Sequence, residues 1–264
     1  MKTVRFFSRK AFSAYENMAI DEALVIETLK QPDSGFIRFY QWQPYSLSFG
    51  IFQHPEKIIS LPELEKAGIQ AVRRSSGGKM VFHADEITFS VALPVKTIEN
   101  KLTHLQHANF LDLFQALISP FIAALNKHGV PAEFSQTISR RDETVVHCYD
   151  APAAHSIMAS GKKLVGAAGI KKDHLFFIHG SMPFSKVLPY EGIFLKKLDS
   201  TLKSDVAYLS EYISRDELTL LETSIVEFFG NEFSLKIMPS DLSESELDAA
   251  NQLARQKYSN LFWK

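Results

Sequence analysis

Residues 35–50 have the sequence GFIRFYQWQPYSLSFG, which predicts two β-strands, over 35–40 and 45–50, joined by a short turn at Gln43 and Pro44. Similar patterns predict the other strands, over 70–73, 80–83, 87–93, 145–149, 155–159, 163–167 and 175–179. Because little helix separates most of these strands, we expect a mixed or mostly antiparallel sheet with helices packed on it. The sequence therefore predicts an α+β fold.

Three serine–glutamate pairs, each spaced three residues apart, are typical of capping boxes at helix starts. They are Ser13 with Glu16, Ser214 with Glu217, and Ser243 with Glu246. The helix that follows the last pair is expected to end near Tyr258. Another, longer helix is expected over 104–128, ended by Gly129 and kinked or broken at Pro120.

The apolar face of the first helix carries one carboxylate. Glu22 falls on the same helical stripe as Tyr15, Met18, Ala19, Ala23 and Ile26. A carboxylate on such a face needs a partner before it needs a substrate. We therefore expect Glu22 to form a structural ion pair with a buried arginine.

The composition excludes several classes of protein. The chain has 264 residues with a net charge of -1, so no basic field points to nucleic acid or to an anionic membrane. Its one cysteine, Cys148, excludes an intramolecular disulfide and a multi-cysteine metal cluster. The 21 phenylalanines supply either a large core or a pocket for an apolar ligand.

Targeting signals are also absent from the pattern. The basic start of the chain resembles a transit peptide, but the helix capped at Ser13 leaves little dispensable sequence before it. No secretory apolar region follows, and the apolar stretch 117–125 is far below membrane-spanning length. These features favour a cytoplasmic protein.

The segment 73–79, RRSSGGK, lies between two expected strands and combines cations with two glycines. Glycines let backbone amides approach a ligand closely, and the cations suit an anionic group such as a phosphate or carboxylate. The segment is not a P-loop, because Arg73 and Met80 stand where that motif needs glycine and serine or threonine. A glycine turn with solvated charges fits the pattern equally well.

The segment 83–86 has metal-capable side chains in His83, Asp85 and Glu86. Neither an HExxH motif nor a histidine pair with matching carboxylate spacing accompanies them, so we expect no metal site. A hydrogen-bonded structural role is the better interpretation of His83.

Cys148 and Lys163 form a further candidate pair. A lone cysteine is usually a small buried apolar residue, but Cys148 ends an expected strand, and Lys163 lies on another strand within pairing range. A nearby ammonium group favours the thiolate and polarises a thioester carbonyl. His147 would point to the opposite face of the strand, so it is a poor base for Cys148.

Taken together, these segments resemble the lipoate/biotin protein ligase superfamily, and within it the cysteine-dependent octanoyltransferases of the lipoate-protein ligase A-like family. The similar segments run nearly end to end: 17–24, 38–44, 47–53, 73–78 with His83, 86–91, 148–152, 161–166, 179–181 and 246–258. The resemblance implies one catalytic domain over residues 1–264, with a helical C-terminal extension from about residue 205.

The resemblance also implies the site. Cys148 and Lys163 would be the catalytic residues: Cys148 would carry an octanoyl or lipoyl group as a thioester, and Lys163 would contact the acyl carbonyl. The substrate-binding residues would be Arg73, Ser76, Gly77, Gly78, His83, Gly166 and His179. No metal and no cofactor would be required; ATP and magnesium would be needed only by a ligase.

The implied partners are proteins. The donor would be acyl carrier protein or an octanoylated lipoyl-domain protein, and the acceptor a lipoyl-domain protein such as glycine cleavage H protein or a dehydrogenase E2. Neither nucleic acid nor membrane is expected as a partner. Lys79 follows the glycine pair where ligases of the superfamily have a third small residue, which favours the transferase.

The sequence departs from the family after Gly166. Where the family usually has Ser-Ala-Gln, this chain has Ala167, Ala168 and Gly169, so it lacks the serine hydroxyl and the glutamine amide. Two alternatives therefore stay open beside the acyltransferase: an ATP-dependent lipoate-protein ligase, and a non-catalytic protein that binds a lipoyl domain or carrier protein.

Overall fold

A large mixed sheet forms the centre of the molecule. The structure is a computed structural model that describes residues 2–136, 156–189, 191–195 and 206–263. Eight strands lie in the order β11-β1-β2-β6-β10-β9-β8-β7, and a smaller sheet has the order β4-β3-β5. The strands are β1 (Lys2–Phe12), β2 (Gly35–Trp42), β3 (Ser46–Phe49), β4 (Gln70–Arg73), β5 (Val81–His83), β6 (Glu86–Pro94), β7 (Ala132–Phe134), β8 (Ile157–Ala159), β9 (Lys162–Lys172), β10 (Leu175–Pro183) and β11 (Leu235–Pro239).

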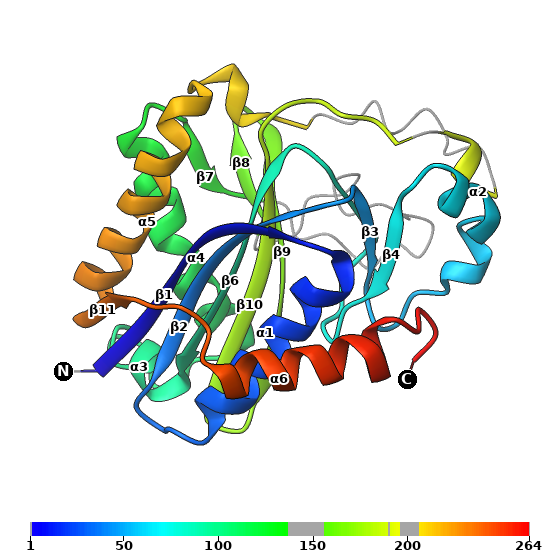
Figure 1. Cartoon of the computed structure of the whole chain (residues 1–264). Coiled ribbons are helices and arrows are strands. Elements are labelled where there is room, and N and C mark those ends of the chain that lie inside the picture. Colours follow the sequence, from blue (N-terminus) through cyan, green and yellow to red (C-terminus); the bar gives the residue numbers. More distant parts are fainter. Residues whose placement is uncertain (1, 137–155, 190, 196–205, 264) are drawn as a thin grey trace.

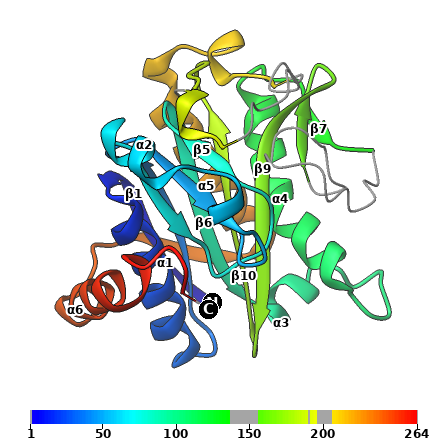
Figure 2. The same cartoon turned by 90° about the vertical axis from the view of Figure 1, so that its right-hand side faces the viewer.

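The large sheet is covered by helices on both faces (Figures 1 and 2). The helices are α1 (Ala14–Leu29), α2 (Leu61–Lys66), α3 (Val95–Glu99), α4 (Phe110–Lys127), α5 (Leu218–Phe233) and α6 (Glu244–Leu253), with the shorter turns η1 (Pro55–Lys57), η3 (Glu191–Ile193), η5 (Leu209–Glu211), η6 (Arg215–Glu217) and η7 (Ala254–Tyr258). In β2, Ile37 and Phe39 pack with α4 and α5, whereas Phe36 and Tyr40 pack with α1 and α6. This alternation follows from the two-residue period of a strand.

Strand directions confirm the predicted fold class. The pairs β1–β2, β1–β11 and β3–β4 are parallel, and the remaining pairs are antiparallel. A mixed, mostly antiparallel arrangement with packed helices is the α+β architecture that the sequence predicts.

The two strands of segment 35–50 exist, but they do not pair with each other. β2 lies between β1 and β6 in the large sheet, whereas β3 lies between β4 and β5 in the small one. All of β3 and nearly all of β2 are buried, without the alternating exposure of a surface hairpin. The turn at Gln43 and Pro44 thus carries the chain from one sheet to the other.

The capping boxes are confirmed, and one helix start is corrected. The Ser13, Ser214 and Ser243 boxes all form at helical starts. The helix expected from residue 104 begins instead at Phe110, because Asn109 accepts hydrogen bonds from the amides of Leu111 and Asp112 at 2.8 and 3.1 Å. Pro120 lies inside α4.

Both ends of the described chain contribute strands that the sequence did not predict. The basic N-terminal segment forms β1, which pairs with β2 and β11. β11 interrupts the C-terminal region that was expected to be helical, and it forms the edge of the large sheet. The strand expected over 145–149 lies outside the described residues.

The ion pair predicted for Glu22 has a different partner. Glu22 accepts hydrogen bonds from Lys257 Nζ at 2.7 Å and from the Tyr258 hydroxyl at 2.6 Å. The buried arginine is Arg38, and it pairs with Asp21 at 2.6 Å. One residue turns a helix position by about 100°, so Asp21 faces the sheet while Glu22 faces the C-terminal turn η7.

Phenylalanines fill the core between the sheet and α4 and α5. Phe89, Phe121 and Phe229 are fully buried there, with ring centroids of Phe89 and Phe121 only 4.1 Å apart.

Among the described residues, no helix has the length and apolar character needed to cross a bilayer.

Candidate active site

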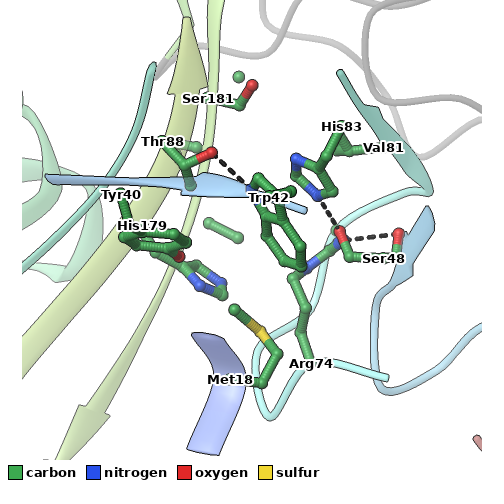
Figure 3. A pocket seen from close by; sticks show the side chains of 15 residues that line it. Met18, Tyr40, Trp42, Ser48, Arg74, Val81, His83, Thr88, His179 and Ser181 are labelled. Carbon is green, nitrogen blue, oxygen red and sulfur yellow. Dashed lines mark hydrogen bonds between the residues drawn. The ribbon is translucent and has the colours of Figure 1, made fainter. Parts of the chain in front are cut away.

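A pocket of about 400 Å³ lies where the two sheets meet (Figure 3). Its lining comes from α1, β2, β3, β5, β6, β9, β10 and the loop after β4: Met18, Tyr40, Trp42, Ser48, Arg74, Gly78, Val81, His83, Thr88, Gly166, Ala167, Ala168, His179, Gly180 and Ser181. Neither an acidic residue nor a phenylalanine is among the described residues that line it. The pocket combines hydrogen-bond donors with a small apolar wall, which suits a carbonyl or carboxylate group attached to an apolar chain.

Ser48, His83 and Glu86 form a hydrogen-bonded series at one side of the pocket. His83 Nε2 lies 2.6 Å from the Ser48 hydroxyl oxygen, and His83 Nδ1 lies 2.5 Å from Glu86 Oε1. The His83 ring is stacked on Trp42, with centroids 3.9 Å apart. An ionised carboxylate only accepts, so Nδ1 carries the hydrogen that His83 donates to Glu86.

Glu86 is the centre of this network. It is 3% exposed, and its carboxylate accepts from Thr88 Oγ1 at 2.6 Å, from Ser181 Oγ and from His83. Burial acts to raise the pKa of Glu86, but His83 and the hydroxyl donors outweigh it, and the pKa falls below its ordinary value. Thr88 in turn accepts from Trp42 Nε1 at 2.7 Å.

Arg74 supplies the cation of the pocket. Its Nη1 donates to the Ser48 carbonyl at 2.8 Å and to the Ser48 hydroxyl at 2.6 Å, and its Nη2 donates to the Lys79 carbonyl at 2.8 Å. Gly78 has a φ of 95°, and a Cβ there would lie 3.3 Å from Arg74 Nη2. Glycine at position 78 therefore allows both the backbone turn and the close guanidinium.

Arg73, which the resemblance implied for substrate binding, does not line the pocket. Its guanidinium donates to the backbone carbonyls of Ile51, Gln53 and Leu261 at 2.6, 3.0 and 3.1 Å. The two arginines are neighbours, so their side chains leave the backbone in different directions. The structure thus places Arg74 rather than Arg73 at the pocket.

Ser76 and His179 meet beside the glycine loop. Ser76 Oγ lies 2.5 Å from His179 Nε2, and both side chains are buried. Burial, together with the charges of Arg74 and His83, lowers the pKa of His179 to about 3. His179 is therefore a neutral imidazole near neutral pH.

A second buried polar cluster lies behind the pocket, on α1, β2 and β6. Asp21 accepts from Arg38, from the Tyr40 hydroxyl at 3.0 Å and from Ser90 Oγ at 2.8 Å. Burial raises the pKa of Asp21, and Arg38 opposes this shift. The cluster fixes the Tyr40 ring, which lines the pocket.

Lys163 is 4% exposed and lies on β9, three residues before the pocket wall begins at Gly166. Its backbone carbonyl accepts from the Ala207 amide at 3.0 Å. Lys163 thus does not extend into solvent. Cys148 lies outside the described residues.

One of the two departures from the family pattern falls in the pocket wall. Ala167, in place of the usual serine, lines the pocket, whereas Gly169 is not among the lining residues. A Cβ at Gly169 would lie 2.9 Å from the Phe177 carbonyl and 3.1 Å from both Ile178 Cγ2 and Phe114 Cε2, so a glutamine does not fit there without movement of the backbone. The pocket wall itself loses only the serine hydroxyl at position 167, which makes it less polar.

The structure brings together only part of the set that the resemblance implied. Four residues of the set line the pocket: Gly78, His83, Gly166 and His179. Ser76 does not line it, but its hydroxyl contacts the lining residue His179. Gly77 is not among the lining residues. Sequence reasoning missed the pocket residues Ser48 and Arg74 and the buried Glu86. Arg74 and Glu86 stand in quoted motifs, but spacing alone did not separate them from their neighbours. No group of three metal-capable side chains occurs among the described residues.

Comparison with known proteins gives full-length similarities. Octanoyltransferase LipM of Carboxydothermus hydrogenoformans is 28% identical and is covered over 98% of its length by all of this chain. LipM of Exiguobacterium sp. is 31% identical, with 95% of this chain and 94% of the relative covered, and LipM of Bacillus subtilis is 26% identical, with 99% and 98% covered.

Solved structures share the fold. A crystal structure of lipoate-protein ligase A bound with ATP matches with a TM-score of 0.78 at 22% identity, covering 100% of this chain and 98% of that one. Protein Ta0514 from T. acidophilum, a putative lipoate protein ligase with bound lipoic acid, matches with a TM-score of 0.77 at 22% identity, covering 98% and 97%. The lipoyl protein ligase A/B catalytic domain, as a family model, matches residues 13–229. The chain belongs to the lipoyl protein ligase A/B catalytic domain family.

Proposed function

We propose that this protein is an octanoyltransferase of lipoate assembly, with Cys148 as the nucleophile and Lys163 as its cationic partner. The observation that carries the proposal is the end-to-end similarity to octanoyltransferases named LipM. The pocket supports it, because the small wall at Gly166, Ala167 and Ala168 suits an acyl chain and Arg74 suits its polar end.

The reaction has two steps, a thioester exchange onto Cys148 and an aminolysis of the resulting thioester. The Cys148 thiolate attacks the acyl carbonyl of a carrier-protein thioester, and the carrier leaves as a thiolate that takes up a proton. The amine of an acceptor lysine then attacks the Cys148 thioester; an amide forms, the amine loses a proton, and the cysteine sulfur is released. The ammonium group of Lys163 stabilises the thiolate and the negative charge on the acyl oxygen.

The proposed acyl transfer requires no nucleotide. A thioester donor is already activated, whereas a free acid must first be converted to an adenylate. Burying six methylenes at about 0.8 kcal/mol each offers roughly 5 kcal/mol for holding an octanoyl chain. We accordingly propose that no cofactor takes part.

The proposed donor is acyl carrier protein or an octanoylated lipoyl-domain protein, and the proposed acceptor is a lipoyl-domain protein. Glycine cleavage H protein and the dehydrogenase E2 subunits are the acceptor candidates. We also propose that residues 1–264 act as one catalytic domain in the cytoplasm. The packing of β11 against β1 and of α6 beside α1 supports a single domain.

An intact-mass measurement tests the chemistry. Incubated with octanoyl-acyl carrier protein and no ATP, the protein is expected to gain one octanoyl group, and Cys148→Ser is expected to abolish the hydroxylamine-sensitive thioester and the transfer to a lipoyl domain. Cys148→Ala serves as the non-nucleophilic control. A protein that gains no adduct, or one that keeps full transfer after Cys148→Ser, contradicts the proposal.

The second candidate is an ATP-dependent lipoate-protein ligase. It is favoured by the fold shared with lipoate-protein ligase A, and Lys79 after the glycine pair argues against it. Its signature is lipoylation of a lipoyl domain from free lipoate, dependent on ATP and unaffected by Cys148→Ser. Binding of a lipoyl domain without transfer from any donor would instead indicate a non-catalytic protein.

A further inference from the structure

Phe52 is an exposed aromatic residue in the turn after β3. Its exposed fraction is 86%, the highest among the described large apolar residues that are exposed. Single exposed apolar residues are common on protein surfaces and need no explanation by themselves. What distinguishes Phe52 is the rigidity of its turn and the place where that turn lies.

A buried arginine fixes the backbone of this turn through hydrogen bonds. Arg73, 6% exposed, donates to the carbonyls of Ile51 and Gln53 at 2.6 and 3.0 Å, which are the residues on either side of Phe52. The Gln53 amide also donates to the Gly50 carbonyl at 3.0 Å. The backbone that presents Phe52 is therefore fixed before any partner arrives, which lowers the entropy lost on binding.

The same turn is packed directly on the glycine loop of the pocket. The Ile51 amide donates to the Ser76 carbonyl at 2.9 Å. A Cβ at Gly50 would collide with the Gly78 carbonyl, and one at Gly77 would lie 4.0 Å from Phe52 Cε2. Because Gly78 lines the pocket, Phe52 stands beside the pocket wall on its solvent side.

We propose that Phe52 is the anchor on which the acceptor protein docks while its lysine enters the pocket. This inference rests on the proposed function. A lysine amine is carried on a stem of only four carbons, so the acceptor backbone must come up to the pocket rim. When acyl carrier protein is the donor, its thioester sits at the end of a much longer prosthetic arm, so this donor can stay farther away. An apolar side chain at the rim thus contacts the acceptor rather than an acyl carrier protein donor.

The test measures the two half-reactions, acylation and transfer, separately in the Phe52→Ala variant. Acylation of Cys148 by octanoyl-acyl carrier protein is followed by intact mass, and transfer from the purified acyl-enzyme to an apo lipoyl domain is followed as a function of acceptor concentration. Central aromatic anchors contribute most of the binding energy of an interface. We expect the acceptor concentration at half-maximal rate to rise roughly 10- to 30-fold, with unchanged acylation and unchanged Tm.

Two further variants complete the experiment. Phe52→Tyr keeps the ring and is expected to retain most acceptor binding, and Leu220→Ala, an exposed apolar residue on α5 that is 59% exposed, is the matched control with wild-type kinetics. An unchanged acceptor dependence in Phe52→Ala overturns the inference, as does an effect confined to acylation by the carrier protein. Failure of the wild-type protein to become acylated at Cys148 counts against the proposed function instead.

Discussion

Two buried glutamates in different regions of the molecule have opposite electrostatic character. Glu86, beside the pocket, is 3% exposed, and Glu222, on α5 beside Arg9 of β1, is 5% exposed. The pKa of Glu86 is lowered although burial acts to raise it, because His83 and hydroxyl donors stabilise the carboxylate. Burial raises the pKa of Glu222 to about 7, and Arg9 only partly opposes this.

The difference lies in the donors around each carboxylate. Three side chains donate to Glu86. Arg9 Nε lies 3.1 Å from Glu222 Oε1 but without the alignment of a hydrogen bond, so that oxygen has no hydrogen-bond partner. Burial therefore does not decide the charge of a carboxylate by itself; the number and geometry of its donors do.

The largest expected effect comes from removing the centre of the pocket network. Glu86→Ala leaves three buried donors without an acceptor, and we expect a loss of about 3 kcal/mol in the free energy of unfolding. Denaturant titration at pH 7 measures it. Glu99→Ala, at an exposed position on α3, is the control and is expected to change stability by less than about 0.5 kcal/mol. Equal losses in both variants would show that Glu86 is not the centre of the network.

Glu222→Gln is expected to have an effect that depends on pH. The folded pKa of about 7 exceeds the ordinary value of 4.5, so the folded state holds a proton that the unfolded state releases between these values. Wild-type stability therefore falls as pH rises through this window, and the neutral glutamine removes the loss. We expect Glu222→Gln to gain about 2–3 kcal/mol at pH 8 and to match the wild type below pH 4.5.

The control for this experiment is Glu227, which is exposed on the same helix. Glu227→Gln should leave the wild-type pH profile unchanged. If Glu222→Gln follows that same profile in thermal melts from pH 4 to 8, the carboxylate of Glu222 is not titrating in the way its surroundings indicate.

The smallest of these effects is expected for Ser181→Ala, which removes one of the three donors to Glu86. A loss of about 1 kcal/mol at pH 7 is expected. Because the pKa of Glu86 is lowered in the folded state, its stabilisation is present above pH 4.5 and is lost as pH falls through the folded pKa. Ser181→Ala should move that acid loss to higher pH, whereas Ser245→Ala, on the exposed part of α6, should leave it in place.

Local signals in the sequence predicted much of the fold. Serine–glutamate caps act within one helical turn, so Ser13, Ser214 and Ser243 were identified correctly without tertiary information. The β1 and β11 strands were missed because their partners are distant in the chain. The Asn109 cap was missed because the helical pattern before it was extended too far.

The candidate site was predicted less completely. Cys148 and Lys163 were a candidate pair from their chemistry and expected strands, and the family resemblance implied their catalytic roles. Those roles stay predictions because Cys148 lies outside the described residues. Gly78, His83, Gly166 and His179 do line one pocket. Ser48 was missed, because a serine in a buried strand gives no signal until the histidine of a neighbouring strand lies 2.6 Å away.

By itself, the sequence determined the helix caps, the α+β class and the family motifs, since each depends on residues close together in the chain. Only the tertiary structure decided between adjacent candidates: Asp21 rather than Glu22 for the buried arginine, and Arg74 rather than Arg73 for the pocket. The physical reason is that one step along a strand or helix turns a side chain to another face, and packing between distant segments sets which face meets the site.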